Sequence, residues 1–397
     1  MFKIYDLNMK ELPFPEGVKP LDIFVSSVNK RRLTEEFEGR SGTLNYGYDY
    51  GERSVDLSLW LEAHDTIDYR LIRNELYAFF DAHDVFYIEE TRVPSRVLKV
   101  TIDESYIPER INQTHSSVEI SCRTLDSVFW ESKYTTLELH DSGYSATAEK
   151  YGLVDNIDDE KVKYRFEPDL KKVTLKSSDF EQGSISSATG ADTTSTSEIR
   201  TVSYFETIPG ETFTFKDDIN GDSINYWWLF EYDENGGYLG YSNTPVGGNG
   251  ELKFVAKGHR LRVRSVSYNG IKPEDVGVQT LPTIEGIDKN NKFTVYNAGN
   301  VTVEPESMYL ELLFYYCTIP DGKMTVKNLT TGDVLEINSV ENRMHIKQSG
   351  MKLTIGAVQR FRDTNRRFIS LAPGDNQFEI TGATFDEARF DFKYYYK

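Results

Sequence analysis

The sequence is poor in cysteine and in long apolar runs. Its 397 residues include only 2 cysteines, Cys122 and Cys317, which excludes a disulfide framework or a cysteine-rich metal cluster and fits folding in a reducing compartment. No run approaches the roughly 18 apolar residues of a membrane-spanning helix. The N-terminal segment MFKIYDLNMKELPFPEG also lacks the basic start and apolar core of a secretory signal. We therefore expect no membrane insertion and no export by a signal peptide.

Positive charge is also scarce. Lysine and arginine number 45 against 63 acidic residues, so the formal net charge is −18. Such a charge favours repulsion from a phosphate backbone or an anionic bilayer. The composition therefore excludes specific nucleic-acid binding as the main role.

The catalytic and phosphate-binding motifs GxSxG, GxxxxGK[ST] and HExxH are absent. The alternation of Asp218, Asn220 and Asp222 is similar to a calcium loop, but Ser223 stands where an EF-hand has glycine and Leu229 where it has glutamate. We therefore expect a turn there, and no metal or cofactor. The histidines carry no ligand spacing either: His64, His83, His115, His140, His259 and His345.

An acidic cluster over Asp155, Asp158, Asp159 and Glu160 could supply the paired carboxylates of a glycan hydrolase. With 63 acidic residues in the chain, however, such a cluster arises by chance. We expect it to be a solvated loop and the protein not to be an enzyme.

Period-2 alternation dominates the chain, and aromatic residues reach 13%. From Ser54 to Glu62, four apolar residues share one side: Val55, Leu57, Leu59 and Leu61. The segments 98–103 and 118–123 alternate in the same way. The sequence thus predicts a mainly β protein with half-buried strands.

One helix is expected in the N-terminal third, with Asp65 as N-cap and Asp68 in the first turn. Its apolar stripe comprises Ile67, Leu71, Ile72, Leu76, Phe79 and Phe80. Around this helix we expect an α+β domain over residues 1–168, ending after the strand-like run VKYRF.

Residues 169–290 are expected to form a jelly-roll-like β-sandwich. Its first part, Ser177 to Ser197, is so polar that we expect loops. Strands are expected at 199–208, 211–216, 226–232, 238–241 and 259–268, with the turn DENGG between the third and the fourth. A boundary near Leu281 to Asn291 precedes a second sandwich over 291–397, whose turns contain Gly322, Gly332 and Gly382.

Aromatic residues and arginines gather on one predicted hairpin and a later strand of the 169–290 segment. An exposed ring stacks on a sugar, and an arginine fork holds hydroxyl or acidic groups. Alternation separates Tyr226, Trp228, Phe230 and Tyr232 from Trp227 and Leu229, so one set must be core. The candidate glycan-binding residues are Tyr226, Trp227, Trp228, Tyr232, Tyr238, Tyr241, Arg262 and Arg264. The alternative is that these rings only fill the core and cover a sheet edge.

Four runs in the N-terminal third are similar to the distal tail protein (Dit) family of long-tailed phages that infect Gram-positive bacteria, staphylococcal type. They are GERSVDLSLWLEA, DYRLIRNELYAFFDA, VFYIEETRVPSRVLKVTI and SVEISCRTLDSVFWES. Later runs that resemble the family are YGLVDNIDDEKVKYRFEP, FTVYNAGNVTVEP and LAPGDNQFEITG. The segment between the two flanks departs from the short form and resembles an inserted carbohydrate-binding module.

The resemblance implies a belt-like N-terminal domain that closes a homohexameric ring at the tail tip and a galectin-like C-terminal sandwich. It implies tail tube proteins, a baseplate hub or tail-associated lysin and receptor-binding proteins as partners, and assembly in the host cytoplasm. All four tryptophans precede residue 291, so the stacking indole of galectins is missing and the last domain is expected to dock protein. A host cell-wall polysaccharide is the expected ligand of the insertion. The alternatives are a free-standing carbohydrate-binding adhesin and a glycan hydrolase.

Overall fold

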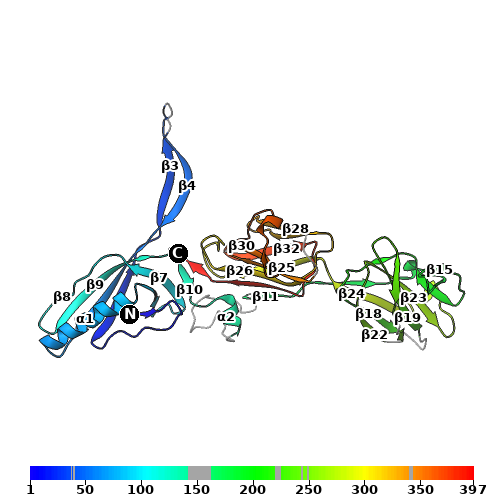
Figure 1. Ribbon diagram of the computed structural model, residues 1–397, viewed down its shortest axis with the longest axis horizontal. Coiled ribbons are helices and arrows are strands. Elements are labelled where there is room, and N and C mark those ends of the chain that lie inside the picture. Colours follow the sequence, from blue (N-terminus) through cyan, green and yellow to red (C-terminus); the bar gives the residue numbers. More distant parts are fainter. Residues whose placement is uncertain are drawn as a thin grey trace.

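The computed structural model describes residues 1–36, 38, 41–141, 162–219, 225–242, 245–247, 250–338 and 343–397. These residues form mainly β-structure, as the sequence predicts, with two α-helices among them. Three bodies follow one another along the molecule, and a two-stranded hairpin projects from the first (Figure 1). The predicted acidic cluster at 155–160 and part of the predicted calcium-like turn lie outside the described residues.

The first body is a nine-stranded antiparallel sheet with the order β1-β6-β7-β9-β5-β2, extended by β8, β10 and β34. Its strands are β1 (Phe2–Tyr5), β2 (Val18–Val25), β5 (Ser54–Glu62), β6 (Val85–Glu90), β7 (Arg96–Ile102), β8 (Glu109–Arg110), β9 (His115–Thr124), β10 (Trp130–Ser132) and β34 (Tyr395–Tyr396). The predicted alternation of β5 is confirmed, because Val55, Leu57, Leu59 and Leu61 are fully buried. The sheet thus combines strands from the N-terminal third of the chain with one strand from residues 395–396.

Helix α1 (Thr66–Ala82) packs against this sheet. Asp65 is its N-cap, as predicted, and its carboxylate accepts hydrogen bonds from the backbone N–H groups of Ile67 and Asp68. The predicted apolar stripe is only partly correct. Ile72, Leu76 and Phe80 are buried together with Tyr69, whereas Ile67 is 70% and Leu71 56% exposed. The buried face of the helix is rotated relative to the predicted stripe, because Tyr69, which the stripe does not include, is buried with the other core-facing residues.

Residues 170–287 form two facing sheets, here called the 170–287 sandwich. One sheet has the order β12-β24-β18-β22 and the other β13-β16-β23-β19-β20, with β17 and β21 at its side. The first comprises β12 (Leu170–Thr174), β18 (Thr212–Ile219), β22 (Glu251–Val255) and β24 (Thr280–Ile287). The second comprises β13 (Phe180–Gln182), β16 (Glu198–Thr201), β17 (Phe205–Glu206), β19 (Asn225–Tyr232), β20 (Tyr238–Tyr241), β21 (Val246–Gly247) and β23 (Arg260–Ser267).

One expectation for this segment is wrong. Ser177 to Ser197 is not only loop, because it contains β13, the short hairpin β14 (Ser184–Ile185) and β15 (Asp192–Thr193), and buries Phe180 and Ile185. These two side chains supply the apolar contacts that the polar composition conceals. Near the predicted boundary at 281–291, β24 leads after two residues into β25 (Asn290–Asn297).

The C-terminal sandwich combines a six-stranded sheet, β11-β33-β26-β29-β30-β31, with a four-stranded sheet, β25-β32-β27-β28. The six strands are β11 (Arg165–Phe166), β26 (Leu310–Cys317), β29 (Met344–Ser349), β30 (Lys352–Ile355), β31 (Val358–Gln359) and β33 (Glu387–Phe392). The other sheet adds β27 (Lys323–Asn328), β28 (Val334–Asn338) and β32 (Gly374–Thr381) to β25. The predicted glycine turns are confirmed, because Gly322, Gly332 and Gly382 all have positive φ.

The bodies are joined by packing as well as by the chain. Helix α2 (Thr136–Asp141) contacts β33, and Phe129, Leu139 and Phe166 belong to the core of the C-terminal sandwich. The two sandwiches meet where the Thr384 hydroxyl donates to a carboxylate oxygen of Glu211 at 2.9 Å, and Glu211 is only 2% exposed. Short 3₁₀ turns complete the fold at Ser177–Asp179, Pro273–Asp275 and Phe361–Asp363.

Candidate functional site

A largely exposed element of the described structure is the hairpin of β3 (Asn29–Glu36) and β4 (Thr43–Gly51). It forms a two-stranded sheet of its own and projects away from the first body (Figure 1). Every residue of β3 is exposed. Since an isolated two-stranded hairpin is marginal in water, and unpaired strand edges are templates for further pairing, this hairpin is a candidate assembly interface.

The base of the hairpin is anchored and the remainder is not. Tyr50 contacts Phe129 edge to face, with 5.0 Å between ring centroids, and packs on the core of the C-terminal sandwich. Beyond this contact, the hairpin exposes large apolar side chains: Leu33 is 42%, Tyr46 58% and Tyr48 45% exposed. Because these side chains remain in water in a single chain, their burial against another chain would stabilise an assembly.

Charge along β3 is segregated. Lys30, Arg31 and Arg32 lie near the base, whereas Glu35 and Glu36 lie toward the tip. Lys30 stands over the ring of Tyr48 at 4.4 Å. The hydrogen bond with Tyr50, followed by the charge of Lys30, lowers the pKa of the Tyr48 hydroxyl. The hairpin therefore offers a neighbour cations and carboxylates along β3 and tyrosine rings along β4.

The predicted glycan residues do not form one accessible site. Trp227 is fully buried in the core of the 170–287 sandwich, and its indole N–H donates to Asp217 at 2.6 Å. A residue in this position cannot stack on a sugar, so Trp227 is removed from the candidate set. Its neighbour Trp228 lies on the opposite face of the strand and is half-buried.

The opposite face is largely covered by the β14–β15 loop. Phe230 and Tyr232 are buried there against Ile185. The hydroxyls of Tyr232 and Tyr238 donate to the carbonyls of Gly190 and Ser187, each at 2.8 Å. Tyr232 and Tyr238 therefore hold this loop rather than present a polar edge to a ligand, and burial raises the pKa of Tyr232 to about 12.

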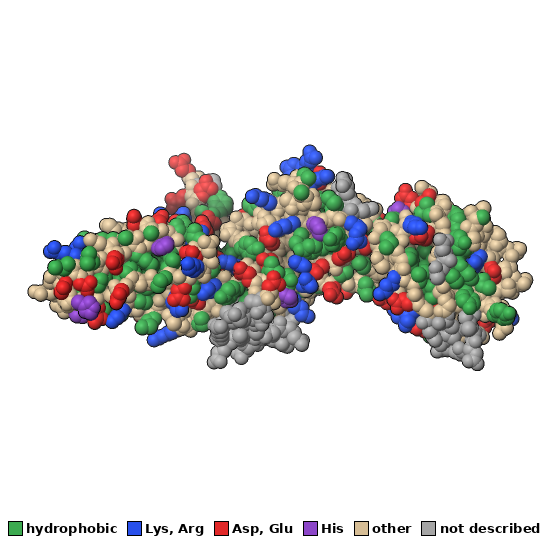
Figure 2. All heavy atoms as spheres, turned by 60° about the horizontal axis from the view of Figure 1, so that its bottom comes forward, with side chains coloured by type: hydrophobic (Ala, Val, Ile, Leu, Met, Phe, Trp, Pro, Cys, Tyr) green, Lys and Arg blue, Asp and Glu red, His purple; other side chains and the backbone are tan. Residues whose placement is uncertain are grey.

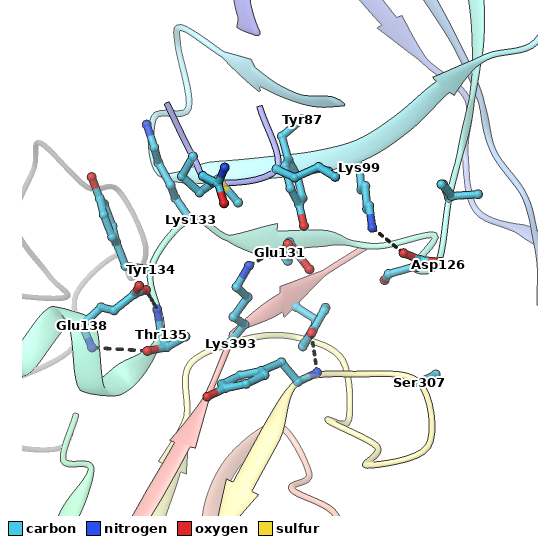
Figure 3. Close-up of a pocket in the computed structure, with 17 residues that line it drawn as sticks. Tyr87, Lys99, Asp126, Glu131, Lys133, Tyr134, Thr135, Glu138, Ser307 and Lys393 are labelled. Atoms are coloured by element: carbon cyan, nitrogen blue, oxygen red, sulfur yellow. Dashed lines mark hydrogen bonds and ion pairs between the residues drawn. The ribbon is translucent and has the colours of Figure 1, made fainter. Parts of the chain in front are cut away.

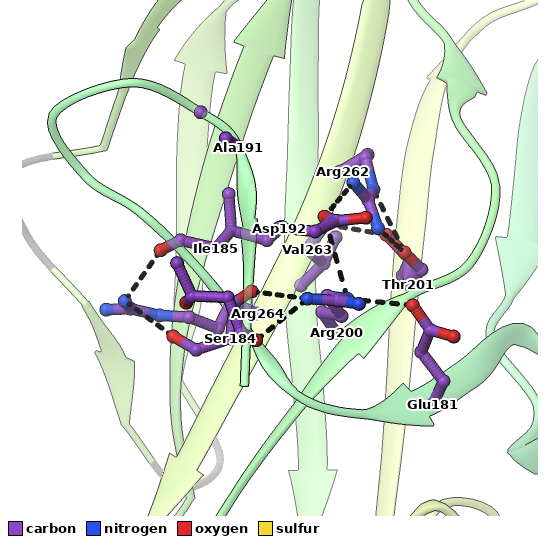
Figure 4. Close-up of polar contacts among 12 residues, drawn as sticks. Glu181, Ser184, Ile185, Ala191, Asp192, Arg200, Thr201, Arg262, Val263 and Arg264 are labelled. Atoms are coloured by element: carbon purple, nitrogen blue, oxygen red, sulfur yellow. Dashed lines mark hydrogen bonds and ion pairs between the residues drawn. The ribbon is translucent and has the colours of Figure 1, made fainter. Parts of the chain in front are cut away.

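Two arginines predicted for ligand binding are also engaged with the protein (Figure 4). Arg262 is 5% exposed and donates to Thr201 O at 2.9 Å and to Asp192 at 2.6 Å. Arg264 donates to Ile185 O at 3.0 Å. Arg262 is therefore a structural residue, whose buried fork could not reach a sugar.

The candidate residues that remain accessible form a smaller group. Tyr226 is 40% and Tyr241 37% exposed, and Arg264 lies over the indole of Trp228 at 4.8 Å. The Tyr226 and Trp228 rings are 6.5 Å apart. The structure thus brings together Tyr226, Trp228 and Arg264 and separates them from Trp227.

A cavity of about 570 Å³ lies between the first sheet and the C-terminal sandwich (Figure 3). Its wall carries lysines and carboxylates, but these neutralise each other. Lys393 pairs with Glu131 at 2.8 Å and Lys99 with Asp126 at 2.5 Å. Glu138 accepts a hydrogen bond from the Thr135 N–H at 2.8 Å. Glu131 and Asp126 are thus held in ion pairs, and Glu138 accepts a hydrogen bond from the backbone at the start of α2.

The described residues contain no group of three or more histidine, cysteine or acidic side chains that could hold a metal ion. In the same part of the chain, no helix has the length and apolar character needed to cross a membrane.

The sequence reasoning missed the hairpin. A signal was present in β4, where Tyr46, Tyr48 and Tyr50 alternate with polar residues and glycine. The pattern of a strand with one aromatic side was there, but within the described residues only Tyr50 of that side packs on a core, whereas Tyr46 and Tyr48 are exposed.

Comparison with known proteins gives one family match. Residues 15–122, which include the hairpin and helix α1, match the model of the phage tail protein RIFT-related domain. This confirms the predicted resemblance to phage tail proteins for that segment. Among curated proteins, none matches this chain.

Solved structures show only a distant likeness. The crystal structure of Dit from phage SPP1 is 6% identical with a TM-score of 0.41, over 99% of both chains. A chain of the activated phage p2 baseplate with strontium is 10% identical with a TM-score of 0.31, over 99% of this chain and 97% of that one. Because both TM-scores lie below 0.5, we base the proposed function on the family match and on the hairpin.

Proposed function

We propose that this chain is a structural subunit of a phage tail, of the distal tail type, and that it has no catalytic role. The observation that carries this proposal is the hairpin β3–β4, which lies within the segment that matches a phage tail domain and has unpaired edges and exposed apolar side chains. Hairpins from neighbouring copies that pair edge to edge would bury these side chains and satisfy both edges.

Six copies would close a ring at the tail tip. Such a ring would connect tail tube proteins to the baseplate hub or tail-associated lysin and carry receptor-binding proteins at its rim. A net charge of −18 per chain suits a channel that DNA must pass without binding. The proposed domains are residues 1–168 for the ring, 169–290 for an insertion of the carbohydrate-binding-module type and 291–397 for a galectin-like sandwich, with assembly in the host cytoplasm.

The experiment is a comparison of Leu33→Asp with Leu329→Asp by light scattering and negative-stain imaging. Leu33 is 42% and Leu329 43% exposed, and only Leu33 lies on the hairpin. The wild type and Leu329→Asp should form six-fold rings, whereas Leu33→Asp should remain monomeric because it places a charge in the interface. A wild type that stays monomeric and binds glycan would favour the adhesin, and turnover of purified cell wall would favour the hydrolase.

We further propose that the 170–287 sandwich binds a host cell-wall polysaccharide through Tyr226, Trp228, Tyr241 and Arg264. Arg264 stacked on Trp228, beside the exposed ring of Tyr226, supports this because a fixed ring and a fixed guanidinium recognise a sugar face and its polar substituents. Tyr226→Ala should weaken binding to purified cell walls, whereas Tyr268→Ala, which removes a tyrosine that is 99% exposed on the same sandwich, should not. Equal binding of folded Tyr226→Ala and wild type would contradict this proposal.

A further inference from the structure

The outward face of the six-stranded sheet in the C-terminal sandwich carries a row of cations. Pairing places Arg165 of β11 opposite Arg389 of β33, Arg389 opposite Leu313 of β26, and Leu313 opposite Lys347 of β29. Their strand neighbours Phe166, Phe390, Leu312 and Ile346 are buried, so the row itself points outward. Three cations therefore lie along one line that crosses four strands.

The row consists of cations, whereas the chain as a whole has a net charge of −18. Like charges directly opposite each other destabilise a sheet, yet two arginines occupy the pair between β11 and β33. Glu387 forms an ion pair with Arg165 Nε at 3.1 Å and accepts a hydrogen bond from Arg389 Nε. A guanidinium has five N–H donors, and these two contacts engage one donor of each arginine.

Aromatic rings adjoin the row where β26 departs from regular pairing. The register of β26 and β29 shifts between Phe314 and Cys317, and Tyr316 adopts a φ of +49°. The rings of Tyr315 and Tyr316 both contact the ring of His345, with centroid distances of 5.0 and 4.6 Å. Arg389 stands over Tyr315 at 4.4 Å. A tyrosine in the left-handed backbone region costs free energy. Here this conformation places the ring of Tyr316, next to that of Tyr315, on the exposed face.

Figure 2 shows lysine, arginine and histidine side chains on the central body of the molecule, interspersed with acidic and hydrophobic ones. Arg165, Arg389, Lys347 and Tyr316 do not line the best-formed cavities of the described residues. Since small ligands and cofactors bind in concave sites, a macromolecular partner suits this face better.

We propose that this face docks an acidic surface of a second, different protein. Tyrosine and arginine are the residues that contribute most at protein interfaces, and guanidinium forks recognise carboxylates in preference to neutral groups. The inference deepens the proposed role as a tail hub by giving one partner surface its chemistry. It concerns another face than the hairpin, so ring formation and docking can fail separately.

The test measures binding of a fluorescein-labelled peptide of alternating glutamate and serine to the full chain, by fluorescence anisotropy. The matched pair of variants is Lys347→Gln and Lys323→Gln. Each removes a lysine that pairs with a glutamate at 2.9 Å, Glu311 and Glu336 respectively, but Lys323 lies on the other sheet. Lys347→Gln and Arg165→Gln should each raise Kd about three-fold, as expected for a partly exposed charge pair, while Lys323→Gln should leave it unchanged.

Tyr316→Asn tests the aromatic part. Asparagine tolerates a left-handed backbone, so this variant should fold normally and still raise Kd about three-fold. Added salt should weaken binding by the wild type more than by Arg165→Gln, because the variant has one charge contact fewer.

Three results would overturn the proposal. The first is equal peptide binding by Lys347→Gln, Lys323→Gln and wild type. The second is a carboxylated oligosaccharide such as oligogalacturonate binding more tightly than the peptide, which would assign the face to an acidic glycan. The third is a change in oligomeric mass in Lys347→Gln, measured in parallel by light scattering, which would assign the face to contacts between copies of this chain.

Discussion

At the scale of single residues, the adjacent tryptophans of β19 show what decides whether a side chain enters the core. Trp227 is fully buried and bonded to Asp217, while Trp228 lies on the other face beneath Arg264. The Asp217 carboxylate is itself fully buried and accepts a second hydrogen bond, from the hydroxyl of Thr280. A buried acid with two donors thus fixes the orientation of the core indole.

This buried carboxylate leads to a prediction for pH dependence. Burial raises the pKa of Asp217, although the donors Thr280 and Trp227 partly oppose the shift. A raised folded-state pKa means that Asp217 stabilises the fold best when protonated and loses that contribution as pH rises from about 4. Relative to Asp217→Asn, the wild type should therefore become less stable between pH 4 and 7 in urea unfolding. A difference that stays constant or moves the other way would contradict this.

Alternation predicted two faces for β19 but not which face is core. Both faces receive cover, one from the facing sheet and the other from the β14–β15 loop, so hydrophobicity alone could not separate Trp227 from Trp228. The same limit applies to helix α1, where amphipathic Tyr69 is buried and Ile67 is exposed. The predicted N-cap at Asp65 succeeded because it depends only on neighbouring backbone groups.

At the scale of elements, the β14–β15 loop is held by arginines instead of by a large apolar core. Arg200 donates to the carbonyls of Ser184 and Thr193, at 2.8 and 2.9 Å, and Arg262 joins Asp192 to Thr201. This explains how a segment rich in serine and threonine is ordered despite its composition. Polar side chains and backbone groups form the contacts that apolar burial would otherwise supply.

Removing one of these arginines should therefore destabilise the element. Arg262→Met should lower the free energy of unfolding by about 2 kcal/mol, because a buried carbonyl and a carboxylate lose their donor. Arg260→Met is the control, since Arg260 is half-buried and lies over Tyr204 at 5.5 Å. Urea unfolding measures both variants, and equal stability of the two would contradict the structural role of Arg262.

Elements that bury one face in the core of this chain could be predicted from the sequence. An element that packs against little of the described chain could not. Strand β5 was identified to the residue because its four apolar side chains enter the core of the same chain. The hairpin β3–β4 was overlooked because most of it packs against nothing within the described chain.

At the scale of the whole molecule, β34 and Lys393 join the first sheet to the C-terminal sandwich. Strand β34 pairs with β10, and Lys393 reaches Glu131 at 2.8 Å with 15% and 12% of the two side chains exposed. This pairing links residues more than 250 positions apart. Nothing in local sequence patterns indicates such a pairing, which is why the sequence predicted the sandwiches but not how they are joined.

Breaking the ion pair should weaken this junction. Lys393→Met should cost about 3 kcal/mol because it leaves Glu131 poorly solvated and without its cation. The double variant Glu131→Gln/Lys393→Met should cost less than the sum of the two single variants, and a double-mutant cycle in urea measures the coupling. Additive costs would show that the two side chains act independently.

The position of β34 also has a consequence for biosynthesis. Because Tyr395 and Tyr396 belong to the same sheet as Phe2, that sheet is complete only after residues far later in the chain have been synthesised. Domains usually fold during translation, N-terminal part first, but here a nascent chain that has not yet reached β34 lacks one strand of its first sheet. Chains that lack β34 would carry an open strand edge beside β10, and an open edge is a template for pairing with other chains.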